Sequence, residues 1–539
     1  MDLLNYLGDG LAAAATPENL LYALIGCIIG TALGLLPGIG STAGIAILLP
    51  ITFGMEPASA IIMLAAIFYG TSYGGTITSV LLNIPGEGET AITCLDGYQM
   101  TLRGRAGAAL TIAGFGSFIG GTVATIGLII AAQPLSKLGL MVGPPEFFAL
   151  VLVGVALLVG LVGTSVSGGL IAAAIGMLIA MVGIDPIQGL PRFTFGSAHL
   201  LDGISIVPVL VGLFGLGELL HGSATSVTRP PIPMLRDLLP TRTEIRRAAP
   251  TIGRGTVIGA IIGVVPGVTS TISSLLAYST ERKVGRHRDE LGTGAVEGVA
   301  APETANNAHA NSAFIPLFTL GVPASPAIAV LMGAFLLNGL TPGPALFQSD
   351  PVLVWTVIAS LLIGNVILVV LNVPLVGLWT RLLAIPYPIL RALILVFIIV
   401  GAFAVNRSVT DLYIMVAFGI LGLIFRRCGL PLAPLVLTLV LGPLLESALR
   451  QSMQISNGDP SVFVTRPIAL TMLIVAAAIV AASAIGTRFK RKAEPSVDIE
   501  RGNKEIYASQ QVSSPVSCLD GSAVPGGLRR NAQPIERQR

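Results

Sequence analysis

The feature of this sequence that most constrains its fold is a series of long stretches without a single charged residue. Stretches free of Lys, Arg, Asp and Glu cover residues 19–55, 57–86, 106–136, 147–184, 304–349, 351–380 and 467–487. A membrane-spanning helix needs about 20 predominantly apolar residues, and each stretch is long enough to supply them. Because the stretches are continuous and do not alternate between polar and apolar residues, they predict helices and exclude a transmembrane β-barrel.

Composition points the same way. Apolar residues make up 53% of the 539 positions and charged residues only 11%, whereas a soluble domain carries roughly 25% charged residues. We therefore expect an all-α polytopic membrane protein of about 12 to 14 transmembrane or half-helix segments. The spacings of the four Cys and four His favour neither a disulfide framework nor a metal site. We expect no metal, no cofactor and no nucleic-acid partner, and no Walker motif indicates an ATPase.

An internal repeat divides the chain into two halves. Nine residues starting at Gly34 (GLLPGIGST) recur at Gly263 (GVVPGVTST), with five positions identical. A fainter match pairs the segment starting at Leu82 (LNIPG) with the segment starting at Leu320 (LGVPA), and the offset rises from 229 to 238 residues. We predict a first transmembrane repeat at 1–225, a cytoplasmic linker at 226–250, a second repeat with a final span at 251–487, and a disordered cytoplasmic tail at 488–539.

Charged loops indicate how the two halves are oriented. The first half has no Lys or Arg before Arg103, whereas the matching ends of the second half carry Arg242, Arg246, Arg247, Arg254, Arg282, Lys283, Arg286 and Arg288. By the positive-inside rule, the N-terminus and loop 341–350 face the periplasm. Loops 100–106, 229–254 and 281–297 and the C-terminus then face the cytoplasm. Inverted repeats with broken helices are a secondary-transporter architecture, and a chance bias among short loops is the alternative.

The two Pro-Gly breaks are the first candidate site. Proline interrupts a helix, and broken backbone at membrane depth must be satisfied by protein or by a wet cavity. Hydroxyl residues follow each break, and helix N-termini attract anions. We expect the substrate carboxylates between the two breaks; a kink whose hydroxyls cap their own helix is the alternative. The candidate residues are Gly38, Ser41, Thr42, Gly267, Thr269, Ser270 and Thr271.

Polar residues in the apolar stretches provide further candidates. The segment 69–79 is rich in Gly, Ser, Thr and Tyr, and its counterpart 302–312 carries three Asn and one His. Such residues are costly in a membrane unless they face a cavity or a partner. We expect Asn83, Asn306, Asn307 and Asn311 to line the substrate cavity. Candidates for the coupling ion are Glu87, Glu303 and His309. Five acids near the membrane all flank the spans, so solvated loop acids are an alternative, and for His309 the alternative is a hydrogen-bonded packing residue. The five acids are Glu87, Glu89, Asp96, Glu297 and Glu303.

Several blocks of the sequence together resemble one transporter family. They are Gly34–Gly38 (GLLPG), Asn83–Gly86 (NIPG) with Asp96–Tyr98 (DGY), Arg254–Gly259 (RGTVIG), Leu320–Pro323 (LGVP) and, above all, Glu297–Ala308 (EGVAAPETANNA). These blocks resemble the large membrane subunit of the tripartite tricarboxylate transporter family. The resemblance covers roughly residues 15–485 and leaves out the tail.

The resemblance implies a function that composition alone does not. Family members are multi-pass secondary transporters of the bacterial inner membrane that import carboxylates, citrate among them, by symport with Na⁺ or H⁺. They work with a small membrane subunit of about four spans and a periplasmic substrate-binding protein. The chain departs from the family pattern at Val268–Ser270 and Ala308–Asn311, where it carries extra polar residues. The substrate is therefore expected to be a tricarboxylate or a related organic anion, not necessarily citrate.

Two other classes of function remain as alternatives. One is an ion channel, or a stand-alone permease for a small solute, in which the Asn, Ser and Thr segments form a filter. The other is a membrane-embedded enzyme, but no spacing of His or Cys supplies a convergent catalytic set. We expect no enzymatic activity.

Overall fold

The computed structural model describes residues 2–36, 39–139, 142–161, 165–185, 189–221, 238–382 and 387–493. The chain divides into two compact units, Met1–Thr487 and Arg488–Arg539. The predicted tail from residue 494 onward, residues 222–225 of the predicted first repeat and residues 226–237 of the predicted linker lie outside the described residues. The first unit holds both predicted repeats, and the fold discussed below is that of this unit.

Helices make up almost all of the described structure. The part before the linker contains α1 (Asp2–Ala14), α2 (Pro17–Gly34), α3 (Gly40–Leu48), η1 (Leu49–Thr52), α4 (Pro57–Leu82), η2 (Gly88–Thr90), α5 (Thr93–Leu102), α6 (Ala106–Gly139), α7 (Pro144–Leu161), α8 (Val166–Ala180), η3 (Ala198–Leu200), α9 (Ile206–Leu210), the π-helix η4 (Val211–Leu216) and α10 (Gly217–His221). Two short antiparallel strands, β1 (Gly183–Ile184) and β2 (Pro191–Arg192), pair Gly183 with Arg192.

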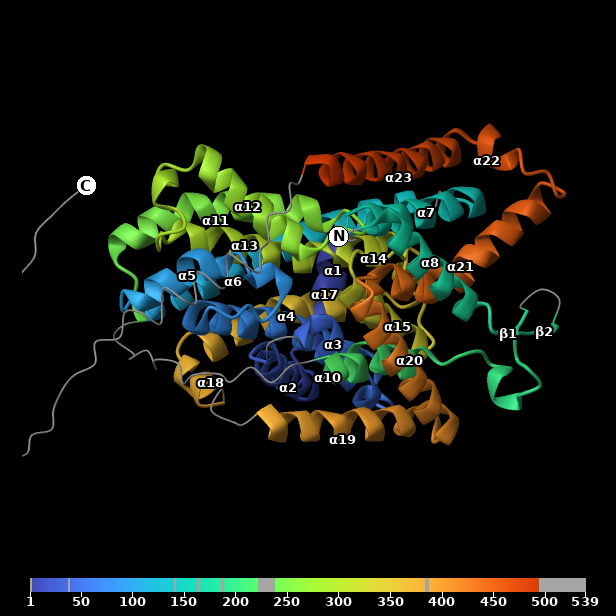
Figure 1. The fold of residues 1–539 in the computed structure, drawn as a ribbon, viewed down its shortest axis with the longest axis horizontal. Coiled ribbons are helices and arrows are strands. Elements are labelled where there is room, and N and C mark those ends of the chain that lie inside the picture. Colours follow the sequence, from blue (N-terminus) through green and yellow to red (C-terminus); the bar gives the residue numbers. More distant parts are fainter. Residues whose placement is uncertain are drawn as a thin grey trace, which may run out of the picture. The chain divides into compact units, whose positions relative to one another are not determined.

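The part after the linker is also helical. It contains α11 (Arg242–Gly263), α12 (Ser270–Val284), η6 (Arg288–Glu290), α13 (Glu297–Ser312), α14 (Phe314–Leu320), α15 (Pro326–Leu337), α16 (Leu346–Ser349), α17 (Pro351–Asn372), α18 (Val376–Leu382), α19 (Tyr387–Asn406), α20 (Val409–Arg427), α21 (Leu432–Ile455), α22 (Val462–Thr465) and α23 (Pro467–Ala493). Figure 1 shows α11, α12 and α13 packed side by side next to α6.

The lengths of these helices match a membrane protein. Within the described residues, seven helices are long and apolar enough to cross a membrane: α2, α4, α6, α17, α20, α21 and α23. Six shorter apolar helices accompany them. The chain is thus an all-α polytopic membrane protein, as the uncharged stretches predicted. The centre of the fold is formed by α4 and α13, whose residues are almost all buried.

Stripes of glycine fix the two central helix pairs. At each glycine of the stripe an added Cβ would lie within 3.0 Å of a carbonyl oxygen of the neighbouring helix, so only glycine permits this approach. On α2 the stripe faces Met63, Ile67 and Thr71 of α4, and on α11 it faces Ala301, Ala305 and His309 of α13. The glycines are Gly26, Gly30 and Gly34 on α2 and Gly255, Gly259 and Gly263 on α11. The glycines keep the 229-residue offset and their partners the 238-residue offset, so the same packing is built twice.

Helices α2 and α3 form one helical hairpin and α11 and α12 form another, with Pro266 and Gly267 at the tip of the second; residues 37 and 38 lie outside the described residues. α4 runs parallel to α2, so α3 and η1 must return the chain to the end where α2 began, and Gly44 of α3 packs against Leu33 of α2. In the second half, Arg254 of α11 forms an ion pair with Glu281 near the end of α12 (2.6 Å). The structure thus folds the chain back in both halves. Backbone of this kind is tolerated at membrane depth where protein surrounds it.

Contacts along helix α6 show in which direction the neighbouring helices run. Arg105, just before α6, pairs with Glu244 in the first turn of α11. Farther along both helices, Ile252 lies beside Gly116. Because both contacts advance together along the chain, α6 and α11 run parallel, and both begin at the same end of the fold.

Helix α17 runs the other way. It passes Gly121 of α6 at Asn365 and Gly114 at Val373, so it is antiparallel to α6. Helix α2 follows α17 in parallel: the Cys27 thiol contacts the Gly364 carbonyl (3.9 Å), and Asn372 donates to Thr31 (3.4 Å). The repeated helices α2 and α11 therefore run in opposite directions.

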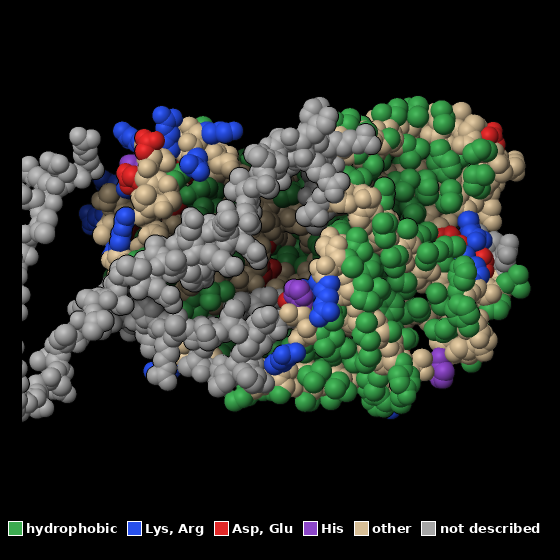
Figure 2. All heavy atoms as spheres, in the orientation of Figure 1, with side chains coloured by type: hydrophobic (Ala, Val, Ile, Leu, Met, Phe, Trp, Pro, Cys, Tyr) green, Lys and Arg blue, Asp and Glu red, His purple; other side chains and the backbone are tan. Residues whose placement is uncertain are grey.

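Charged loops gather at the end where α6 and α11 begin. Arg105 and Glu244 meet there, and Arg247 bonds both Glu290 and Glu297 (each 2.8 Å). Burial would raise the pKa of Glu244, but the backbone N–H of Thr241 and the Arg105 guanidinium hold this pKa below its ordinary value. Figure 2 shows basic side chains concentrated at the end of the molecule that carries α11 and α12 in Figure 1. The described residues of the three loops predicted to be cytoplasmic thus lie together.

Candidate functional site at the two hairpin tips

A short loop joins the two hairpin tips. This loop follows α4 and contains η2, and its Glu87 accepts a hydrogen bond from Ser41 Oγ at the first tip (3.0 Å). Two residues later, Glu89 accepts a hydrogen bond from Ser270 Oγ at the second tip. Gly88 lies between them, and a Cβ there would be 3.0 Å from the Thr271 hydroxyl. The loop therefore brings together hydroxyls of both halves, with a carboxylate facing each tip.

The predicted tip residues differ in their surroundings. Ser41 is buried, Thr42 is half-buried, and neither α3 nor α12 begins with a side-chain cap. The hydroxyls therefore do not cap their own helices, which was the alternative to a binding role. At the second tip, Thr269 and Ser270 are half-buried, whereas Thr271 is exposed.

Two glycines complete the predicted set at the tips. Gly267 has a positive φ of 83°, and its N–H donates to the Ala324 carbonyl (2.9 Å), so its backbone donor is satisfied within the chain. Gly38 lies outside the described residues. Gly267 therefore has a structural role, because residues with a side chain rarely adopt this backbone conformation.

Three glutamates lie near the polar residues of α4: Glu87 is half-buried, and Glu89 and Glu303 are buried. Ser72 of α4 donates to Glu89 (2.7 Å), and one helical turn later Thr76 donates to Glu303 of α13 (2.6 Å). Glu303 is fully buried and also accepts from Thr93 and from Asn306 (3.3 Å). The alternative of solvated loop acids is therefore wrong for Glu89 and Glu303. The described hydrogen-bond partners of the three carboxylates are neutral hydroxyl and amide groups, and no arginine or lysine side chain pairs with them in the described structure.

The other polar residues of α13 hold helices together. Asn307 donates to Ser117 of α6 (2.8 Å), and Asn311 accepts from Thr125 of the same helix (2.7 Å). His309 Nδ1 shares a 2.8 Å hydrogen bond with Ser273 of α12. The structure therefore places Asn307, Asn311 and His309 in helix interfaces and brings Asn306 to Glu303.

Asn83 lies apart from these groups. It ends α4 in the left-handed conformation, with a φ of 58°, and its side chain is exposed. Gly321 ends α14 in the same way, with a φ of 70°. These equivalent positions support a role as a helix stop, for which Asn and Gly are the suited residues.

A cavity of about 420 Å³ opens beside the first tip. Its wall contains Ser41, Thr42, Glu87, Glu218 of α10 and Arg426 of α20. Arg426 forms an ion pair with Glu218. Arg426, Glu218 and Glu89 were not among the predicted site residues. Glu89 could have been found from its spacing to Glu87, but Glu218 and Arg426 come from distant stretches whose packing the sequence does not reveal.

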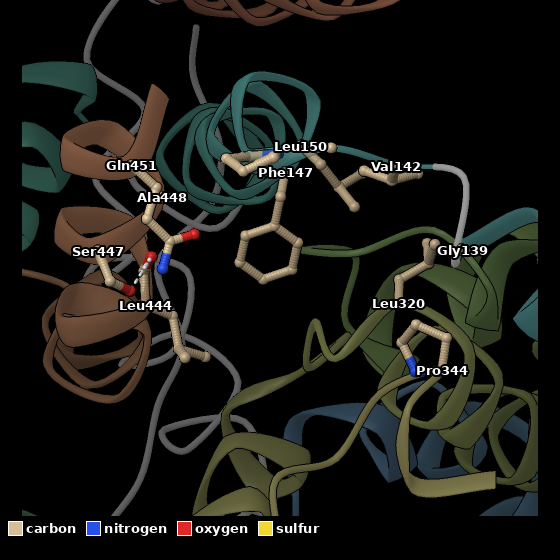
Figure 3. Close-up of a pocket in the computed structure, with 12 residues that line it drawn as sticks. Gly139, Val142, Phe147, Leu150, Leu320, Pro344, Leu444, Ser447, Ala448 and Gln451 are labelled. Carbon is tan, nitrogen blue, oxygen red and sulfur yellow. Dashed lines mark hydrogen bonds between the residues drawn. The ribbon is translucent and has the colours of Figure 1, made fainter. Parts of the chain in front are cut away.

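Two other cavities differ in chemistry. The one shown in Figure 3, about 330 Å³, lies between α7, α21 and Pro344 and is lined mainly by apolar side chains such as Phe147, Leu150 and Leu444. Ser447 in its wall bonds the carbonyl of Leu444 (3.1 Å). A wider cavity of about 870 Å³ lies at the opposite end of α20 from Arg426. Of these three cavities in the described structure, the one at the first tip joins an arginine to the hydroxyls of Ser41 and Thr42.

Comparison with known proteins identifies the family. Residues 20–437 match the Tripartite tricarboxylate transporter TctA family. The chain belongs to this family. It is therefore a multi-pass membrane transporter and not an enzyme.

Two relatives from Agrobacterium vitis extend the match. The uncharacterised 52.8 kDa protein in the TAR-I ttuC' 3' region is 46% identical over 481 residues, which cover 89% of this chain and 96% of the relative. A protein in the TAR-II ttuC' 3' region is 48% identical over 215 residues, or 40% of this chain and 89% of the relative. No solved structure matches the chain.

Proposed function

We propose that this TctA-family protein is the large membrane subunit of a binding-protein-dependent secondary transporter in the bacterial inner membrane. It imports tricarboxylates or related organic anions together with Na⁺ or H⁺. The observation that carries the proposal is the meeting of two repeated hairpin tips at one loop, with Ser41 and Ser270 bonded to Glu87 and Glu89. The opposite directions of α2 and α11 support an inverted-repeat architecture, in which substrates bind at the repeat interface.

Substrate carboxylates bind at the hairpin tips. Ser41 and Thr42 line the cavity of about 420 Å³, which is within the range of small-molecule pockets. Both hydroxyls lie in the first turn of α3, where N–H groups and the helix dipole favour a negative charge. Ser270 and Thr271 hold the equivalent place on α12.

The glutamates couple the cation to the substrate. An uncompensated charge in a low-dielectric site is costly, so the carboxylates of Glu87, Glu89 and Glu303 require a proton or a bound cation. Glu87 lines the same cavity as Ser41 and would repel an incoming anion while it is charged. Neutralisation of Glu87 by H⁺ or Na⁺ therefore favours entry of the anion, which is the condition for symport.

The partners follow from the tripartite family. A periplasmic protein captures the substrate, and a small membrane subunit completes the transporter. The chain alone should then accumulate no substrate.

Reconstituted uptake tests this proposal. Proteoliposomes with the complete system should accumulate radiolabelled citrate or another carboxylate when a Na⁺ or pH gradient is imposed, and should lose uptake without the binding protein. Glu87→Gln should abolish the dependence on the gradient, whereas Glu56→Gln at the exposed start of α4 should keep it. Equal uptake with and without the binding protein would refute the assignment, and a gradient-dependent Glu87→Gln protein would refute the role of Glu87.

A further inference from the structure

The cavity at the first hairpin tip is lined by a basic side chain, Arg426, that does not belong to the tip itself. Arg426 lies in the last turn of α20, and its Nη1 pairs with Glu218 of α10. Its Nε is buried and has no hydrogen-bond partner in the described structure. A guanidinium presents its donors in a planar fork that matches a carboxylate, so this arrangement leaves part of the fork unused.

The same cavity is lined by hydroxyl groups that suit a carboxylate. Ser41 and Thr42 line it with Gly40, which has a positive φ of 52° at the start of α3. Glu87 also lines it, and its Oε1 is buried without a hydrogen-bond partner in the described structure, so this carboxyl group can donate to an anion only when it is protonated. A carboxylate ligand in this cavity would thus meet donors from Arg426 and from the hydroxyls.

Charge explains why an arginine is needed at this place. Among the described residues that line the cavity, Glu87 and Glu218 are acidic and Arg426 is basic. Without Arg426 the cavity would repel every anion. With it, neutralisation of Glu87 leaves a balanced Arg426–Glu218 pair, and a substrate carboxylate can exchange for Glu218.

We propose that Arg426 binds one carboxylate of the transported anion at the first hairpin tip, and that Glu218 is the resident counter-ion which the substrate displaces. The inference rests on the proposed function and adds the residue that selects carboxylates over neutral analogues. A bidentate pair between arginine and carboxylate gives directional as well as charge recognition. At the second tip, Leu157 and Leu158 of α7 lie against Gly267.

Equilibrium binding to the purified protein in nanodiscs tests the inference. The probes are radiolabelled citrate, with succinate and its monoamide succinamate as competitors. Arg426→Gln should raise the Kd for citrate about tenfold to a hundredfold and should abolish the preference for succinate over succinamate. Arg426→Lys should restore part of both. Glu218→Gln should lower the Kd, because the substrate no longer competes with a resident carboxylate.

Arg427→Gln is the matched control, since Arg427 is the exposed neighbour on the same helix. It should keep the wild-type Kd and preference. Wild-type binding by Arg426→Gln, or equal weakening by Arg426→Gln and Glu218→Gln, would overturn the inference while leaving the proposed function intact. A wild-type protein that neither binds these carboxylates nor takes them up with its partners would overturn the proposed function and this inference with it.

Discussion

At the scale of single residues, one buried aspartate shows how an acid near the membrane can serve structure. Asp96 of α5 accepts hydrogen bonds from the backbone N–H groups of Gly292, Gly294 and Ala295 and from the Tyr278 hydroxyl (2.8–3.0 Å). The three backbone donors belong to the segment that leads from α12 into α13, and Tyr278 lies in α12. A carboxylate with this many donors is well satisfied, so Asp96 fastens the second half of the chain to the first.

Replacement of this aspartate should destabilise the protein. Asp96→Asn removes the charge and places an amide group opposite backbone donors, which should cost about 1.5–3 kcal/mol. The apparent melting temperature in detergent should fall clearly, and Tyr278→Phe, which removes one donor only, should lower it less. A melting temperature equal to that of the wild type would show that the carboxylate is not the fastening group.

At the scale of elements, the two glycine stripes carry the packing of both halves. A Cβ on Gly259 would lie 2.2 Å from the Ala305 carbonyl oxygen, whereas a Cβ on Gly253 of the same helix would meet nothing within 4 Å. The first position is closed to any side chain and the second is open. A substitution at Gly253 can therefore serve as the control for the same substitution at Gly259.

Alanine at these two positions should have opposite effects. Gly259→Ala must push α11 away from α13 and should destabilise the protein by about 1–3 kcal/mol. Gly253→Ala should stabilise it slightly, by about 0.5–1 kcal/mol, because alanine favours the helix. Thermal unfolding of the two variants side by side measures the difference, and a Gly259→Ala protein as stable as Gly253→Ala would contradict the packing described here.

Elements also show how far the sequence could lead. The Pro-Gly breaks, the repeat and the helical class follow from local patterns, and the glycine stripes carry the same 229-residue offset that the repeat revealed. Contacts such as Ser270 with Glu89 or Arg426 with Glu218 join residues about 180 and 210 positions apart, so only the fold could reveal them.

At the scale of the whole molecule, the length of α6 separates loops 100–106 and 341–350. Its 34 residues extend over about 51 Å, more than the hydrocarbon core of about 30 Å. Arg105 lies before its first turn, and Pro344 packs against Gly139 at its last. Loops 100–106 and 341–350 are therefore at opposite ends of one membrane-spanning helix.

Cysteine labelling should place these loops on opposite sides of the membrane. After removal of Cys27, Cys94, Cys428 and Cys518, single cysteines are introduced as Leu102→Cys and Gln348→Cys, both at exposed positions. An impermeant reagent applied from the periplasm should label only Gln348→Cys. Labelling of both from the same side would contradict the predicted inverted topology.

The central claim is that the two hairpin tips form the transport site, and a double substitution tests it most directly. Ser41→Ala with Ser270→Ala removes both hydroxyls that bond Glu87 and Glu89. Loss of each hydroxyl as a donor to a substrate carboxylate should cost about 1.5–3 kcal/mol of binding free energy. Carboxylate uptake by the complete system should therefore fall at least about tenfold at an unchanged amount of protein in the membrane. Thr280→Ala, whose hydroxyl bonds its own helix at Leu276, should have no effect. Wild-type uptake kinetics in the double variant would contradict the account and move the site toward the segment Asn306–Asn311.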